Sequence, residues 1–373
     1  MIRRLTLLCV LLAPGLLSSC RSGATAAPLS NPAAQSPPSA ANPTPAAPLG
    51  ADTSTPLPTA ELPVQVRHMA ALGLAGEVLY TQGPQGVWSL QLASGEANQV
   101  FRPEPDGYVD GVAVEPGSGR LALSYSATSS IYATHDLYLY EPGAAEPVLL
   151  RQRTFDYEDF IAPVFHPQTG WLYYTRMWLE EGTSGSASQF HLVIERMLPQ
   201  AGAEAQVILE EALQASFSAD GEIMAFIRVA EASYARSLWI ASPYGTGAEP
   251  LVGDGEFIGL YGSQISPAGD QVVFAAYGRR ADPPAELSLL DRLLGVTPAS
   301  AHGLPWDLWL VDRSVSQPVK LTDLYLDDPW PAWSPDSDWI LSLTAPGLLL
   351  TDLQGRTQLL LNAYGHGGVI WLP

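Results

Sequence analysis

The segment Trp333-Ser334-Pro335-Asp336-Ser337-Asp338-Trp339-Ile340-Leu341-Ser342 is the clearest copy of a pattern that recurs through the chain. An apolar residue precedes a Ser-Pro-Asp turn, and an alternating apolar stretch follows it. Pro presets φ and Ser and Asp favour turns, so the pattern predicts two antiparallel strands joined by a tight turn. Four other copies lie at 114–123, 165–174, 217–226 and 265–274. The folded part of the chain is therefore built from repeats.

Two weaker copies extend the series. A degenerate copy lies at 74–80, and the terminal segment 369–373 matches only the beginning of the unit. Neighbouring copies are about 40 to 70 residues apart, which is the range of propeller blades. Strands of alternating pattern follow the hairpins at 87–92, 136–140, 190–194, 237–241, 307–311 and 347–351, and shorter fourth strands are clearest at 147–150, 250–252 and 318–322.

Four strands repeated six times predict an all-β fold, a six-bladed β-propeller of four-stranded blades at 63–373. The terminal segment 369–373 is expected to dock beside the first blade and close the ring, because closure removes the exposed sheet edges that favour aggregation. Whether 64–72 forms an inner or an outer strand of this joint stays open.

The segments 333–337, 307–312 and 318–322 resemble the repeats of the TolB-type, WD-like propeller family. The resemblance covers about 64–373 and implies the fold. Related propellers serve as scaffolds, sensors and non-catalytic domains of peptidases, so it implies no single function. TolB itself carries an α/β domain before its propeller. A Pro/Ala-rich segment takes that place here, so a role in the Tol-Pal system is not implied.

The first residues have the pattern of a signal peptide at 1–19. Arg3 and Arg4 precede the apolar run 5–17, which is shorter than the roughly 20 residues of a transmembrane helix. Leu17-Ser18-Ser19-Cys20 resembles the bacterial lipobox, which implies lipid attachment at Cys20. A secretory signal with an incidental cysteine is the alternative. Cys9 would leave with the signal, so the mature chain could form no disulfide.

A spacer is predicted between the anchor and the propeller. Residues 20–62 are rich in Pro, Ala and Ser, contain no aromatic residue and carry almost no charge, which predicts a disordered, lipid-anchored linker. We expect an extracytoplasmic, monomeric protein held to the cell membrane by acylated Cys20, although the sequence does not indicate which membrane. Each buried methylene of the lipid would contribute about 0.8 kcal/mol.

The charge balance excludes one class of partner. Asp and Glu number 38 against 18 Lys and Arg, which gives a formal net charge of −20. Such a surface repels nucleic acid and anionic lipid headgroups. We therefore expect no nucleic-acid partner, and contact with the lipid bilayer only through the acyl group.

In a four-stranded blade, the connection from the second to the third strand and the crossover to the next blade share one face, and loops commonly carry function. The crossovers are rich in carboxylates and aromatic rings, which predicts a funnel for a cationic or sugar-like ligand. The predicted funnel residues are Asp106, Tyr108, Asp110, Asp156, Tyr157, Glu158, Asp159, Glu256, Tyr261, Tyr325, Asp327, Asp328, Trp330, Tyr364 and His366. Solvated acidic turns beside core aromatics are an equal alternative.

Two connections between second and third strands are long, at 176–189 and 277–306. The apolar positions of 285–294 fit one helical stripe, which predicts a helical insertion at about 278–306. It would form a lid or interaction arm, or a helix that packs only against its own loop. The sequence indicates no cofactor. Structural calcium stays an alternative, although Asp327-Asp328 lacks the EF-hand spacing.

Catalysis finds little support in local motifs. The sequence contains no His-Glu-x-x-His, Cys-x-x-Cys or Gly-x-Ser-x-Gly, and His166 occupies a turn position where other repeats carry Ser. We predict a binding or scaffold module that recognises a protein, peptide or glycan through its funnel. The alternative is a metal-dependent lyase or cyclase, with His135, His366 and funnel carboxylates gathered from separate blades.

Overall fold

The computed structural model describes residues 72–128, 134–155, 157–180, 189–230, 233–279, 306–324, 326, 329–363, 365 and 367–373. The predicted signal peptide, Cys20, the linker and the helix at 285–294 lie outside these ranges, as do the predicted funnel residues Asp156, Tyr325, Asp327, Asp328, Tyr364 and His366. Within the described ranges the regular elements are strands, and no helix there could span a membrane.

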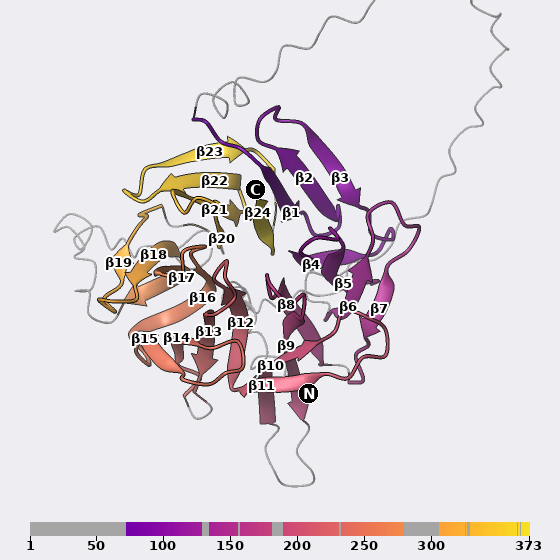
Figure 1. Ribbon diagram of the computed structural model, residues 1–373, viewed down its shortest axis with the longest axis horizontal. Helices are drawn as coiled ribbons and strands as arrows, with labels where there is room; N and C mark the ends of the chain where they lie inside the picture. The colour runs from indigo at the N-terminus through magenta and orange to yellow at the C-terminus, as the bar shows by residue number, and fades with distance from the viewer. Residues whose placement is uncertain are drawn as a thin grey trace, which may run out of the picture. The chain divides into compact units, whose positions relative to one another are not determined.

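The strands form six four-stranded antiparallel sheets placed around a common axis (Figure 1). Blade 1 contains, from the axis outward, β24 (Val369–Leu372), β1 (Glu77–Thr81), β2 (Val87–Gln91) and β3 (Ala97–Phe101). Blade 2 contains β4 (Tyr108–Val114), β5 (Leu121–Ser126), β6 (Asp136–Tyr140) and β7 (Val148–Arg151). Blade 3 contains β8 (Asp159–Phe165), β9 (Leu172–Glu180), β10 (Gln189–Met197) and β11 (Gln206–Glu210).

The second half of the ring repeats this order. Blade 4 contains β12 (Ala212–Phe217), β13 (Met224–Val229), β14 (Arg236–Ala241) and β15 (Glu249–Val252). Blade 5 contains β16 (Phe257–Ile265), β17 (Gln271–Arg279), β18 (Asp307–Asp312) and β19 (Val319–Lys320). Blade 6 contains β20 (Trp330–Trp333), β21 (Trp339–Thr344), β22 (Gly347–Asp352) and β23 (Thr357–Leu361). The predicted all-β, six-bladed propeller is confirmed.

The hydrophobic core lies between the blades. Each of six buried apolar clusters joins two neighbouring blades, for example Leu213 with Phe274 across blades 4 and 5, and Phe101 with Tyr125 across blades 1 and 2. A single blade buries neither of its faces by itself. The ring is therefore stable only when every blade has two neighbours.

The C-terminal strand supplies the last pair of neighbours. β24 pairs with β1 in antiparallel register, from Glu77 opposite Leu372 to Tyr80 opposite Val369. In Figure 1 the yellow end of the chain lies beside the indigo beginning of the described part. The indole Nε1 of Trp371 donates a hydrogen bond to the Ala75 carbonyl oxygen at 3.0 Å. The predicted closure is confirmed, with the last strand of the chain innermost in blade 1.

The repeated turns are fixed by one arrangement of side chains. The hydroxyls of Ser218, Ser266 and Ser334 donate to Asp220, Asp270 and Asp336 at 2.6, 2.8 and 2.5 Å, and each accepts a backbone N–H from the returning strand. In blade 3, His166 stands in the place of the serine. Its Nδ1 accepts the N–H groups of Gln168 and Thr169 at 3.2 and 3.3 Å, so His166 shapes its own turn.

The inner strands carry bulges that tie blades together near the axis. The register shifts within β4, β8, β12 and β16, and the backbone turns left-handed at Gln214, with φ 58°, and at Gly262, with φ 61°. The Gln214 N–H donates to Thr175 Oγ1 of blade 3 at 2.9 Å. Its Oε1 accepts the Gly262 N–H of blade 5 at 2.7 Å. The backbone and the side chain of Gln214 thus link blade 4 to blades 3 and 5.

One connection is shorter than the sequence indicated. Residues 176–189 were expected to join two strands of blade 3, but Arg176 pairs with Val193 and Glu180 pairs with Gln189, so β9 extends through Glu180 and β10 begins at Gln189. Met177, Trp178 and Leu179 are consecutive apolar residues, so this part of β9 lacks the alternation of apolar and polar residues that predicts a half-buried strand.

We predict that Trp371→Ala destabilises the domain by about 3 to 5 kcal/mol, because Trp371 is buried at the closing joint between blades 6 and 1. Urea unfolding followed by circular dichroism measures this change. Val319→Ala, at an exposed position of the outer strand β19, is the control and should stay within about 0.5 kcal/mol. Equal stability of the two variants would contradict this account of closure.

Candidate functional site

We call the face that carries the crossovers and the second-to-third connections the crossover face. Six crossovers lie on this face, and their described residues, in order from blade 1 to blade 6, are as follows: 102–107; 152–155 and 157–158; Glu211; 253–256; 321–324, 326 and 329; and 362–363, 365 and 367–368. Several predicted funnel residues lie at or near the start of inner strands: Tyr108 and Asp110 in β4, Asp159 in β8 and Trp330 in β20. The topology therefore places these four at the axial rim of this face, whereas Tyr261 lies in the middle of β16.

Two predicted residues, Asp110 and Asp159, come together around His135 at the joint of blades 2 and 3. Asp159 Oδ1 accepts the backbone N–H of His135 at 2.7 Å and lies 3.0 Å from its Nδ1. The Phe160 N–H donates to the His135 carbonyl oxygen at 3.1 Å. His135 and Asp159 are both about 6% exposed. The pair therefore fastens the start of β6 to the inner strand of blade 3.

The electrostatics of this pair depend on its burial and its partners. Burial by itself would lower the pKa of His135, but the hydrogen bond to Asp159 and the charge of Asp159 raise the pKa by more. The charge of Asp110 also raises the pKa, and the charge of Arg153 lowers it. The pKa of His135 is therefore raised above its ordinary value of 6.5. The other ring nitrogen, Nε2, is buried and has no hydrogen-bond partner among the described residues. The Tyr108 ring lies 6.3 Å from the imidazole, between centroids.

Glu158 sits in a buried network of charges rather than at an open rim. It is 1% exposed, and its carboxylate accepts hydrogen bonds from Arg176 Nε at 2.6 Å and from the Thr154 hydroxyl at 2.8 Å. Burial would raise the pKa of Glu158, but the bonds from Thr154 and Arg176 hold it below its ordinary value. Glu195 continues the network, 3.4 Å from Arg176 and bonded to the Tyr174 hydroxyl at 2.8 Å. Glu158 therefore positions the crossover.

Tyr261 and Trp330 belong to an aromatic cluster at the joint of blades 5 and 6. Their ring centroids are 6.1 Å apart, and Trp306 lies 4.5 Å from both Tyr261 and Tyr277 in edge-to-face contacts. Trp306 is 4% exposed, and the others are half-buried. The cluster packs the rim and leaves partial ring surfaces open to a ligand.

The remaining predicted residues lie apart from these groups. Glu256 is bonded to Arg279 at 2.8 Å, Asp106 is exposed in the first crossover, and Tyr157 is 41% exposed. The described residues contain no group of three His, Cys, Asp or Glu side chains placed to hold a metal ion. The calcium alternative and the predicted metal site with His366 rest on residues outside the described ranges.

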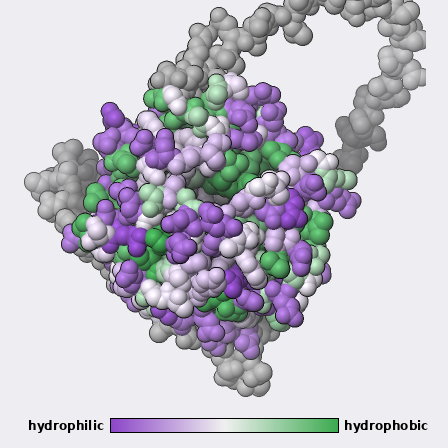
Figure 2. Space-filling view, in the orientation of Figure 1, coloured by the Kyte–Doolittle hydropathy of each residue, from purple (hydrophilic) through white to green (hydrophobic). Residues whose placement is uncertain are grey.

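Several exposed apolar residues on the crossover face were not predicted from the sequence. They are Phe155, Tyr234, Ile258 and Leu324, exposed by 54, 43, 63 and 48%. Phe155, Tyr234 and Leu324 lie in connections between strands, and Ile258 is the second residue of β16. An apolar residue in or beside a polar connection is the signal that could have found them. Figure 2 shows that one face of the ring is hollowed near its middle, with hydrophobic residues inside the hollow and mainly hydrophilic ones around it.

The fold is shared with known propellers. TolB from Acinetobacter baumannii is similar with a TM-score of 0.53 and 14% identity, over 82% of this chain and 70% of that chain. A putative TolB from Agrobacterium tumefaciens is similar with a TM-score of 0.51 and 14% identity, over 79% of this chain and 90% of that one. At this identity the similarity shows the fold alone, a TolB-like six-bladed propeller.

Comparisons at the level of sequence add no relative. No protein-family model matches the chain, and no curated protein matches it.

We predict that Asp159→Asn destabilises the domain more at about pH 6 than at about pH 9. A raised His135 pKa contributes stability that is fully present below 6.5 and is lost as the pH rises through the folded-state value. Melting temperatures of wild type and variant across this range measure the difference. Asp106→Asn, at an exposed carboxylate, should show no such dependence. A pH-independent loss in Asp159→Asn would contradict the ion pair.

Proposed function

We propose that the chain is a membrane-anchored, extracytoplasmic binding or scaffold module that recognises a protein, peptide or glycan through its crossover face. The observation that carries this proposal is the set of exposed apolar side chains on that face, which includes Phe155 and Tyr157 between blades 2 and 3 and Ile258 in blade 5. Exposed apolar residues on loops held by a rigid scaffold are typical of recognition surfaces.

The rigidity of the face supports the same function. Residues 152–155 and 157–158 of the crossover between blades 2 and 3 adjoin two buried pairs, Glu158 with Arg176 and Asp159 with His135, while Phe155 and Tyr157 remain exposed. A loop that is already ordered loses little conformational entropy on binding, so its exposed side chains can contribute to affinity. Glu158 and Asp159 are buried and paired with Arg176 and His135, so a ligand would meet ring surfaces and neutral polar groups at this crossover.

The location of the module rests on the N-terminal residues. Leu17-Ser18-Ser19-Cys20 resembles a lipobox, and the Pro/Ala-rich stretch up to residue 62 would separate an acidic domain of net charge −20 from a membrane surface. Lipid on Cys20 would supply the attachment, and the spacer would let the crossover face reach ligands away from the bilayer.

We predict that Cys20→Ser abolishes incorporation of radiolabelled palmitate into the protein in a bacterial host. The thiol of Cys20 would be the site of attachment, and no other cysteine would remain after the signal is removed. Cys9→Ser, inside the predicted signal peptide, is the matched control and should leave labelling intact. Labelling that survives in Cys20→Ser would overturn the anchor.

We predict that Tyr157→Ala combined with Ile258→Ala weakens capture of a membrane-derived ligand by about tenfold, or roughly 1.4 kcal/mol. Both residues are exposed on the crossover face, so their loss should not unfold the domain. In vivo cross-linking followed by quantitative mass spectrometry measures the capture. Val315→Ala, exposed in the connection from β18 to β19 on the opposite face, is the control. Equal capture by both variants would remove the crossover face from the proposal.

A further inference from the structure

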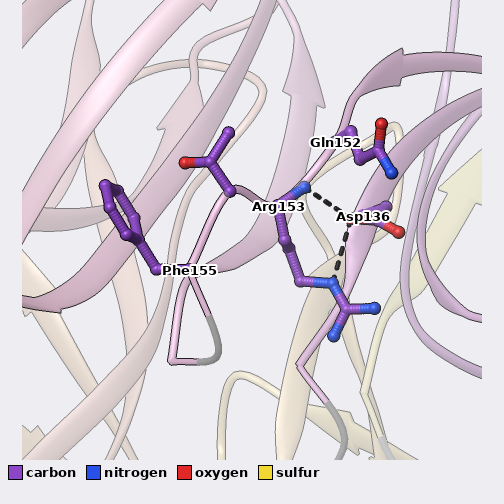
Figure 3. A pocket seen from close by; sticks show the side chains of 5 residues that line it. Asp136, Gln152, Arg153 and Phe155 are labelled. Carbon is purple, nitrogen blue, oxygen red and sulfur yellow. Dashed lines mark hydrogen bonds and ion pairs between the residues drawn. The ribbon is translucent and has the colours of Figure 1, made fainter.

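A depression on the crossover side of blade 2 carries groups that the predicted funnel did not include. It is lined by Asp136, Gln152, Arg153, Thr154 and Phe155 and has a volume of about 290 Å³. Figure 3 shows Arg153 in the middle, with Asp136 and Gln152 on one side of it and Phe155 on the other. This volume lies at the lower end of the range for small-molecule sites, so the depression suits a ligand unit of about one ring.

Arg153 and Asp136 hold each other in fixed positions. The Asp136 Oδ1 atom accepts the backbone N–H of Arg153 at 2.7 Å and its Nε–H at 3.0 Å, while the Arg153 NH1 group donates to Thr134 Oγ1. The second carboxylate oxygen, Oδ2, and the second terminal guanidinium nitrogen have no hydrogen bond within the part of the chain that the structure describes. The pair therefore presents a fixed acceptor beside a fixed donor.

The charges in the depression indicate a neutral ligand. Asp136 and Arg153 compensate each other, so an anion would meet the carboxylate and a cation would meet the guanidinium. The net charge of −20 further opposes anions. Hydroxyl groups both donate and accept hydrogen bonds. Two neighbouring hydroxyls of one ligand can therefore donate to Asp136 Oδ2 and accept from the second terminal nitrogen of Arg153. The amide of exposed Gln152 adds one more donor and acceptor.

Phe155 supplies an apolar surface at the other side of the depression. Its side chain is 54% exposed, although an aromatic ring gains free energy when it is covered. The backbone beside it is fixed, because the Thr154 N–H and hydroxyl both donate to Glu158. A sugar ring has an apolar C–H face and a rim of hydroxyls, which matches one exposed phenyl ring beside fixed polar groups.

We propose that this depression binds a neutral carbohydrate, with one sugar ring stacked on Phe155 and its hydroxyls bonded to Asp136 Oδ2 and the Arg153 guanidinium. The inference rests on the proposed binding function and deepens it, because it names the ligand class and places the contact on blade 2. It assigns roles to Asp136, Arg153 and Phe155, which lie outside the predicted funnel.

The test is calorimetric titration of the full mature chain in detergent with the neutral tetrasaccharides of glucose, mannose and N-acetylglucosamine. Tetragalacturonate and the glucosamine tetramer serve as anionic and cationic probes. We expect one neutral probe to bind, and Phe155→Ala and Asp136→Asn each to weaken it by about tenfold. Phe155→Tyr, which keeps the ring, should retain binding. Tyr244→Ala removes an exposed ring from the opposite face and should change affinity less than about twofold.

Three results would overturn the inference: no binding of any neutral probe at about 10 mM, tighter binding of a charged probe, or binding that Phe155→Ala and Asp136→Asn leave unchanged. Circular dichroism melting of each variant separates a lost contact from a lost fold. If no sugar binds but the Tyr157→Ala and Ile258→Ala substitutions still weaken ligand capture, the proposed function of the crossover face is retained and only the sugar site is rejected. If capture also fails to depend on them, the proposed function falls as well.

Discussion

The pairing of β24 with β1 is the constraint on which the rest of the molecule depends. All six buried clusters lie between blades, so each blade is stable only with a neighbour on both sides. Without the C-terminal strand, blades 1 and 6 would expose apolar faces and β1 would become an open edge. Because β24 follows β1 to β23 in sequence, the complete ring forms only after the whole propeller has been synthesised.

Charged side chains at the joint of blades 2 and 3 serve mainly to hold the crossover. Glu158 and Asp159 are almost fully buried, and each has a basic partner from another strand, Arg176 and His135. A buried carboxylate costs free energy unless it is paired and hydrogen-bonded, so these contacts also specify how the blades meet. Phe155 and Tyr157 of the same crossover are exposed and uncharged, so this part of a strongly acidic chain has a neutral, partly apolar surface.

Most of the fold could be predicted because turn chemistry and alternation are local signals. In the turns of Ser218, Ser266 and Ser334, each serine hydroxyl donates to an aspartate two or four residues later, and the third strand predicted at 136–140 coincides with β6. The candidate site could be predicted only in part. Asp110 and Asp159 do meet, but their common neighbour His135 comes from a different connection. The extension of β9 beyond Arg176 was missed, because the run Met177-Trp178-Leu179 does not alternate between apolar and polar residues.

The sequence by itself determined the number of blades, the order of strands within them and the role of the last strand, because each follows from contacts between residues near in the chain or from a repeated pattern. The tertiary structure decided which carboxylates are paired with basic side chains and which side chains are exposed. Asp136 bonds Arg153 and Glu158 bonds Arg176 across strands, and nothing in the local sequence of either acid indicates its partner. Burial, charge compensation and the exposure of Phe155 arise only when separate strands are brought side by side.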